Sequence, residues 1–163
     1  MPNHELVELE KSQYPLRVKH YVETYNALPW NDQWTEALSF KKISEMMDCR
    51  GAFGLVCHDD NDNFAGVIFG DPKIYFNCKQ FFIKDFFVAL PRQGKGIGSA
   101  LMTEFEKRLS TMGIDKIYLF ASKGEKTEDF YQNCDFHTWG GMVLTGKSIY
   151  LSLLIFYSWS FSI

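Results

Sequence analysis

The sequence predicts an α/β fold, a mixed sheet with helices packed against it, and two kinds of segment lead to this class. Apolar positions recur at helical spacing in two long segments, 14–27 and 97–112. Runs rich in aromatic and β-branched residues, which favour strands, occupy 53–57, 64–75, 81–88 and 117–120. Because both kinds of segment share one chain with no linker or repeat between them, we expect an α/β or α+β mixed sheet flanked by helices.

The N-terminal part of the chain is expected to hold a short strand and two helices. Residues 4–10 alternate weakly between apolar and polar, which favours a first strand. The amphipathic helix over 14–27 ends before Pro29, since proline lacks the N–H that a helix interior needs. A second short helix is expected over 35–48.

An acidic segment, residues 58–63, separates the next two strands. Its sequence, His-Asp-Asp-Asn-Asp-Asn, is typical of a turn, so 53–57 and 64–75 are expected to be consecutive strands. Clustered carboxylates also suggest calcium, but the segment lacks the glycine and the distal glutamate of a calcium loop. We interpret it as a solvated turn that includes His58, and expect no metal site.

The second half of the chain continues with a strand over 81–88 that leads through Ala-Leu-Pro into a glycine-rich loop. The helix that follows starts at Ile97 and ends at Gly113. A strand over 117–120 and a short helix over 125–134 come next.

The last sixteen residues, 148–163, carry no charged side chain. The segment falls short of the roughly 18 apolar residues that suggest a membrane helix, so no membrane span is expected. Two buried strands are the first interpretation, and a membrane-surface or partner-binding tail is the alternative. A β-rich terminus could also pair with a second copy, as in a homodimer. Residues 1–163 are otherwise expected to form one domain.

Charge and cysteine content restrict the class of function. The formal net charge is −3, and nucleic-acid binding is disfavoured because such proteins normally carry a basic excess. Four cysteines form neither a CxxC pair nor a zinc spacing with histidine. The start of the chain shows no signal segment, so we expect a reducing, cytoplasmic setting.

The glycine-rich loop is the strongest functional signal. Its residues run from the strand into the helix and are Gln93, Gly94, Lys95, Gly96, Ile97, Gly98 and Ser99. Glycines let backbone N–H groups approach an anion, and a helix N-terminus adds unpaired donors, so the loop is expected to hold a pyrophosphate, aided by the charges of Lys95 and Arg92. The spacing fails for a P-loop, because Ile97 follows Gly96, and fits a dinucleotide fingerprint poorly, because Ser99 replaces the third glycine.

The remaining pattern, Gln-x-x-Gly-x-Gly, resembles the acetyl-CoA loop of the GNAT superfamily of N-acetyltransferases. A second segment, Phe-Tyr-Gln-Asn-Cys-Asp-Phe over 130–136, is similar to that family's Phe-Tyr-x-x-x-Gly-Phe. Asp135 stands at the usual glycine, and aspartate tolerates the left-handed conformation better than most residues. The resemblance implies a mostly antiparallel central sheet and transfer of an acetyl group from acetyl-CoA to a primary amine of a small molecule. A protein or peptide acceptor and a non-catalytic acyl-CoA-binding module are the alternatives.

The resemblance also implies roles for individual residues. The pantetheine arm is expected to pair with the backbone of Phe87, Val88 and Ala89, and an N–H near Val88 to polarise the thioester. Tyr131 is the candidate acid for the thiolate.

The acceptor side is less defined by the sequence. Asp85 is a candidate base or amine anchor, although strand alternation could give the inward face to Lys84, and a water chain could serve as the base. The segment that contains Trp30, Asp32 and Trp34 looks like an acceptor-side segment of an aminoglycoside-acetyltransferase-like branch, or else is a helix–helix joint pinned by two indoles.

Overall fold

The computed structural model describes residues 5–141 and 143–147. The chain forms two compact units, Met1–Phe120 and Ala121–Ile163, which we describe separately. The apolar segment predicted over 148–163 lies outside the described residues, as do its predicted strands and pairing. The expectation of one domain over 1–163 stays a prediction.

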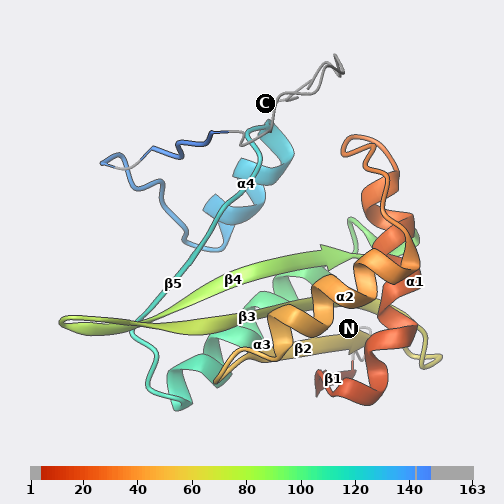
Figure 1. Ribbon diagram of the computed structural model, residues 1–163, viewed down its shortest axis with the longest axis horizontal. Helices are drawn as coiled ribbons and strands as arrows, with labels where there is room; N and C mark the ends of the chain where they lie inside the picture. The colour runs from red at the N-terminus through yellow and green to blue at the C-terminus, as the bar shows by residue number, and fades with distance from the viewer. Residues whose placement is uncertain (1–4, 142, 148–163) are drawn as a thin grey trace. The chain divides into compact units, whose positions relative to one another are not determined.

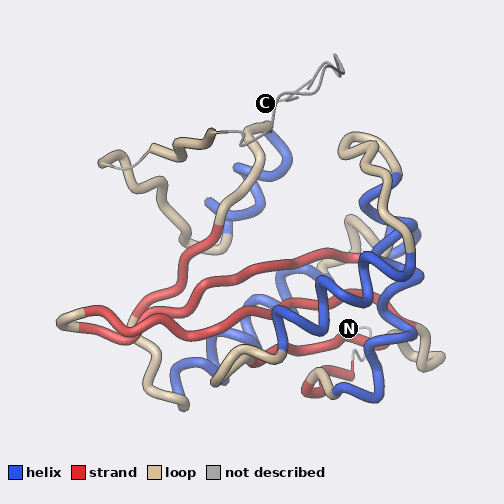
Figure 2. The backbone as a smooth tube through the Cα atoms, viewed as in Figure 1, coloured by secondary structure: helices blue, strands red, loops and turns tan. Residues whose placement is uncertain are grey.

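The first unit is built on a five-stranded sheet with the strands in sequence order, drawn in Figures 1 and 2. Its first four strands pair antiparallel and the fifth pairs parallel to the fourth, which confirms the predicted mixed, mostly antiparallel sheet. The strands are β1 (Glu5–Glu8), β2 (Phe53–His58), β3 (Phe64–Tyr75), β4 (Cys78–Val88) and β5 (Lys116–Leu119).

Three α-helices belong to this unit and lie against the two faces of the sheet. The helices α1 (Tyr14–Asn26) and α2 (Glu36–Met47) contact each other and cover one face, while α3 (Ile97–Thr111) covers the other (Figure 1). Short 3-10 turns occur at Lys11–Gln13 and Leu90–Arg92. The Thr35 hydroxyl caps α2 by accepting a hydrogen bond from the Leu38 N–H, so the predicted start of that helix is confirmed within one residue.

The turn between β2 and β3 is held by Asp59, whose carboxylate accepts the backbone N–H groups of Asn61 and Asn63 at 3.0 and 2.9 Å. This confirms the hairpin turn predicted from the acidic segment. The placement of His58 in that turn is wrong. His58 is the last residue of β2, it is buried, and its Nε2 lies 2.9 Å from a terminal nitrogen of Arg17. β2 thus continues one residue into the polar segment, and all six of its residues are buried.

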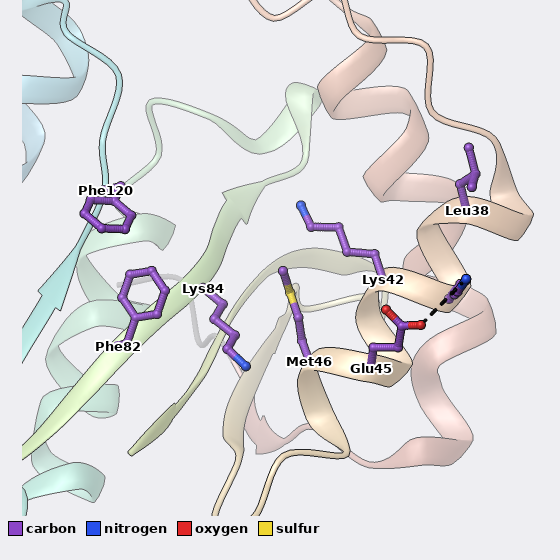
Figure 3. A pocket seen from close by; sticks show the side chains of 8 residues that line it. Leu38, Lys42, Glu45, Met46, Phe82, Lys84 and Phe120 are labelled. Carbon is purple, nitrogen blue, oxygen red and sulfur yellow. Dashed lines mark ion pairs between the residues drawn. The ribbon is translucent and has the colours of Figure 1, made fainter. Parts of the chain in front are cut away.

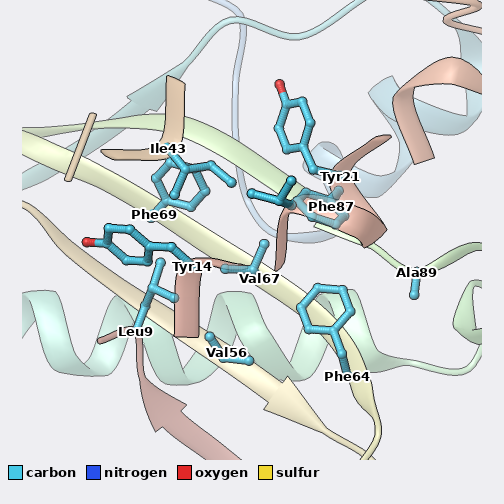
Figure 4. Packing of buried hydrophobic residues seen from close by; sticks show 11 residues of the cluster. Leu9, Tyr14, Tyr21, Ile43, Val56, Phe64, Val67, Phe69, Phe87 and Ala89 are labelled. Carbon is cyan, nitrogen blue, oxygen red and sulfur yellow. The ribbon is translucent and has the colours of Figure 1, made fainter. Parts of the chain in front are cut away.

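Two apolar layers hold the first unit together. On the α1 and α2 side, Tyr21 and Ile43 pack with strand residues such as Val67, Phe69 and Phe87 (Figure 4). On the α3 side, the ring of Phe105 lies 5.5 Å from the rings of both Phe53 and Phe81. Each layer buries the apolar stripe that the sequence pattern predicts for its helix.

A β-bulge interrupts β4 at Lys84. The register passes from Phe69 opposite Asp85 to Gly70 opposite Ile83, so Lys84 is an extra residue without a partner on β3. Alternation is therefore reset at this point. Phe82 and Lys84 before the bulge, and Asp85 and Phe87 after it, all face the side that α1 and α2 cover.

The second unit contains α4 (Glu125–Asn133), which confirms the short helix predicted after β5. The backbone turns back at its end, where the Phe136 N–H donates to the Tyr131 carbonyl at 2.9 Å. Asp135, which stands at the usual glycine of the motif, has φ = 61° and so adopts the left-handed conformation. The ring of Tyr131 lies 5.2 Å from that of Phe130 and 5.6 Å from that of Phe136.

Candidate active site

An open strand edge runs along the C-terminal half of β4. Pairing with β5 ends at Ile83 opposite Leu119, but β4 continues to Val88. The Ala89 N–H donates to the Ala65 carbonyl of β3 at 2.9 Å, so by strand alternation the N–H of Val88 is directed to the opposite edge, away from β3. The Val88 carbonyl accepts a bond of 3.1 Å from the Gln93 side-chain amide.

The sequence proposed three residues for backbone pairing with a cofactor arm, and their N–H groups do not all point to the open edge. Phe87 buries its ring against Tyr21 and Phe64, and alternation turns its backbone N–H toward β3, as the bond to Ala65 does for Ala89. Only Val88 among the three offers its N–H to the open edge.

The N-terminus of α3 follows this edge and is left without a side-chain cap. Ala100 donates to the Gly96 carbonyl at 3.0 Å, the first bond of the helix. The N–H groups of Ile97, Gly98 and Ser99 therefore have no partner within the helix, and they carry its partial positive charge. Backbone donors arranged in this way bind phosphate groups.

Glycines shape the loop before the helix. Gly94 and Gly96 have φ values of 72° and 78°, which favour glycine, and a Cβ built on either residue would meet no atom within 4 Å. The space beside both residues is thus open to a ligand. The residues predicted for the pyrophosphate, Gln93 to Ser99, lie together on this loop and the first turn of α3.

Side-chain charge contributes less to the loop than the sequence suggested. Arg92 forms an ion pair with Asp59 in the turn between β2 and β3. The hydrogen bond from the Asn63 backbone lowers the pKa of Asp59, which keeps this partner ionised. Lys95 is exposed and donates to the Pro91 carbonyl at 3.0 Å. The loop therefore depends mainly on its backbone donors.

Asp85 lies on the other side of the strand edge, buried among polar groups of α1 and α2. Its side chain is 3% exposed, its Oδ2 lies 3.0 Å from the Lys42 Nζ, and its Oδ1 accepts from the Tyr25 hydroxyl. Burial, followed by the charge of Asp85, raises the pKa of Tyr21 well above its ordinary value of 10. Asp85 is thus already bound by a cation and a phenol.

The ammonium group of Lys42 is enclosed by aromatic rings. Its Nζ lies 4.9, 5.9 and 4.8 Å from the ring centroids of Tyr21, Tyr25 and Trp34, within the range of cation–π attraction. It also donates to the Tyr21 hydroxyl. No sequence pattern singled out Lys42, because a lysine on an amphipathic helix is ordinarily a solvated residue.

The segment between α1 and α2 folds back onto the end of α1. The Asn26 side chain donates to the Trp34 carbonyl and accepts from its N–H, at 2.9 and 2.8 Å. The Trp34 indole donates to Asp32 at 2.9 Å, and the half-exposed Trp30 ring lies 5.9 Å from that of Tyr25. The Trp34 ring contacts the ammonium group of Lys42, which is itself paired with Asp85. Trp30, Asp32 and Trp34 do not line the pocket described next.

An open pocket of about 680 Å³ lies between α2 and β4 (Figure 3). Phe82 and Phe120 lie together at one side of it, and the side chains of α2 lie at the other. It is lined by Leu38, Lys41, Lys42, Glu45, Met46, Phe82, Lys84 and Phe120.

Two classes of site do not occur among the described residues. No helix over 5–141 and 143–147 is both long and apolar enough to cross a membrane. Within those same residues, no group of three or more His, Cys, Asp or Glu side chains is placed to hold a metal ion.

Comparisons with known proteins agree with this fold. A family model described as "Acetyltransferase (GNAT) domain" matches residues 18–146, which extend over both units. No curated protein sequence matches the chain significantly.

Several solved structures, acetyltransferases among them, are similar in fold. An integron cassette protein of Vibrio cholerae has a TM-score of 0.74 at 17% identity, over 89% of this chain and 92% of that one. A Trypanosoma brucei acetyltransferase has a TM-score of 0.58 at 21% identity, over 93% and 100%. An aminoglycoside acetyltransferase from an uncultured soil metagenomic sample, solved with sisomicin, has a TM-score of 0.70 at 13% identity, over 90% and 97%. At these identities the likeness shows the fold alone.

Proposed function

Because the chain belongs to the GNAT acetyltransferase family, we propose that it transfers an acetyl group from acetyl-CoA directly to a primary amine of a small molecule. The observation that carries the proposal is the uncapped N-terminus of α3 beside the open edge of β4. The N–H groups of Ile97, Gly98 and Ser99 are suited to a pyrophosphate, and the open space at Gly94 and Gly96 fits one.

On the donor side, we expect residues of the chain to bind acetyl-CoA and to polarise its thioester carbonyl. Acetyl-CoA, when bound, supplies the activated acetyl thioester. Backbone donors from Gln93 to Ser99 hold the pyrophosphate, and the N–H of Val88 donates to the thioester carbonyl as negative charge develops on its oxygen. The reaction joins the amine nitrogen to the acetyl carbon and breaks the carbon–sulfur bond; the nitrogen loses one proton and the sulfur gains one.

We assign that last proton to Tyr131. A phenol with an ordinary pKa near 10 can protonate a thiolate whose acid has a pKa near 8.5. Tyr131 lies on α4, in the segment that resembles the family motif, and its ring contacts those of Phe130 and Phe136. Tyr131→Phe is expected to reduce kcat while the Kd for acetyl-CoA stays unchanged. Tyr75→Phe, at an exposed hairpin tip, is the matched control. Unchanged kcat in Tyr131→Phe would remove this assignment.

On the acceptor side, we propose the pocket between α2 and β4 as the place where the amine enters. Asp85 remains a candidate base or amine anchor, but its contacts with Lys42 and Tyr25 favour a different task, the fixing of Lys42 at the pocket wall. An alkylamine is mostly protonated at neutral pH, so a proton has to leave before attack. We propose that a water chain accepts it.

Two measurements test the proposal together. Calorimetry reports the binding of acetyl-CoA, and an assay for free coenzyme A thiol reports turnover with aminoglycosides, polyamines, amino acids and peptides as acceptors. Binding with turnover on a small amine is the expected result. Turnover on peptides alone would move the assignment to a protein acetyltransferase. Binding without thiol release from any acceptor would contradict catalysis and favour an acyl-CoA-binding module.

A further inference from the structure

The pocket between α2 and β4 carries an unequal distribution of charge. Three of the eight residues that line it are lysines and one is a glutamate. Lys41 and Glu45 form an exposed pair on α2, with 3.8 Å between their charged atoms, and such pairs contribute little in water. The other charged residues that line the pocket are therefore Lys42 and Lys84.

These two lysines are the outer ends of two buried ion pairs. The Lys42 side chain is 27% exposed, whereas its partner Asp85 is 3% exposed. The Lys84 side chain is 15% exposed, and its partner Asp71, 3.1 Å away, is 5% exposed. Both carboxylates lie beneath their ammonium groups, and neither of them lines the pocket. A ligand in the pocket consequently meets the side chains of two lysines and neither of their carboxylate partners.

Lys84 also retains hydrogen-bonding capacity. An ammonium group has three N–H donors, and the contacts of Lys84 with Asp71 and with the Cys49 Sγ, 3.2 Å away, account for at most two of them. At least one donor can therefore serve an anion. The β-bulge is what places this lysine on the pocket side together with Asp85.

The remaining residues that line the pocket are apolar. The Phe82 ring stacks on Tyr118 with 4.9 Å between centroids and meets the edge of Phe120 at 5.2 Å. Leu38 and Met46 extend the apolar lining from α2. A flat or branched apolar group fits such a lining, because burial of its surface is favourable.

We propose that the acceptor is a monoamine that carries both a carboxylate and an apolar body, in the manner of an apolar amino acid. Lys84 recognises the carboxylate, and Phe82 with Phe120 receives the apolar body. This inference rests on the proposed acetyl transfer. A polycation such as an aminoglycoside would bring its ammonium groups against Lys42 and Lys84, so it is a poor acceptor here.

The test compares acceptors that differ only in the carboxylate. Phenylalanine, phenylalaninamide and phenethylamine are assayed by thiol release with acetyl-CoA, and an aminoglycoside serves as the polycation. The expected KM of phenylalanine is lower than that of the other two by about tenfold, the value of one charge-assisted hydrogen bond. Equal or lower KM values for phenethylamine or the aminoglycoside would overturn the inference and leave acetyl transfer intact.

A binding measurement keeps the inference separate from catalysis. N-acetylphenylalanine and its amide are titrated into the protein by calorimetry, and tighter binding of the carboxylate is expected whether or not turnover occurs. Lys84→Gln is expected to remove that preference, while Lys73 remains to neutralise Asp71, 2.6 Å away. Lys107→Gln, an exposed lysine of α3 paired with Glu104, is the matched control and should keep the preference. Equal affinity for the two ligands in the unmodified protein, or a preference that survives Lys84→Gln, would refute the assignment.

Discussion

Gly96→Glu tests the phosphate loop most directly, because α3 provides its own control at the other end. Gly96 precedes the helix with φ = 78°, and Gly113 follows it with φ = 73°. Neither glycine has an atom within 4 Å of an added Cβ. Glutamate at either position is therefore expected to bring similar backbone strain, about 1–2 kcal/mol, and no clash within the protein.

The two substitutions differ in what the new charge meets. At the N-terminus of α3 a carboxylate interacts favourably with the helix dipole, by about 0.5 kcal/mol, and at the C-terminus it interacts unfavourably by a similar amount. Gly96→Glu should consequently be the more stable variant by about 1 kcal/mol. A carboxylate about 5 Å from a pyrophosphate of charge about −2 costs about 1.7 kcal/mol even at the dielectric constant of water, or roughly 20-fold in Kd.

Calorimetry with acetyl-CoA and urea denaturation form the assay. The expected result is opposite rankings, since Gly96→Glu should lose acetyl-CoA affinity by at least about 20-fold yet unfold at a higher urea concentration than Gly113→Glu. Affinity retained in Gly96→Glu would refute the position of the pyrophosphate. Equal loss of affinity in both variants would mean that strain alone explains the effect.

Three further predictions concern stability. Asp85→Asn should lower the free energy of unfolding by about 3 kcal/mol, because it leaves Lys42 without its carboxylate, and the double variant with Lys42→Met should recover part of that loss in urea denaturation; an unchanged midpoint would contradict the pairing. Burial lowers the pKa of His58 below 6.5, so the unfolded chain takes up the proton first, and stability should fall as the pH drops from 6.5 toward that lower pKa; His58→Gln should flatten this part of the Tm profile, and a profile of unchanged slope would count against it. Ile43→Ala, at a fully buried position, should cost about 3 kcal/mol, whereas Leu38→Ala on the exposed side of the same helix should cost little; similar losses would contradict the packing of α2.

The fold was predictable because its signals are local. The helices over 14–27 and 97–112 repeat apolar residues with the helical period, and the strands are bounded by turns of typical composition. The glycine loop was predictable for the same reason, since positive φ values and uncapped N–H groups depend on a few consecutive residues.

The charges around the site could not be read from the sequence. Alternation assigns Lys84 and Asp85 to opposite faces, and only the register with β3 shows that a bulge places both on one face. The pairs of Arg92 with Asp59 and of Lys42 with Asp85 join residues far apart in the chain. Whether a charged side chain is free or compensated depends on such distant partners, which composition and spacing do not specify.

The bulge at Lys84 has a consequence for how β4 tolerates change in length. Upstream of it β4 is paired on both edges, with β3 and with β5, and downstream it pairs with β3 alone and leaves its other edge open. Because side chains alternate with a period of two, loss of this single residue would exchange the two faces for every earlier or later position. Substitution at Lys84 should therefore keep both faces of β4 in place, whereas its deletion should disrupt the core and the site together. The side-chain alternation of β4 thus depends on the presence of one extra residue, Lys84.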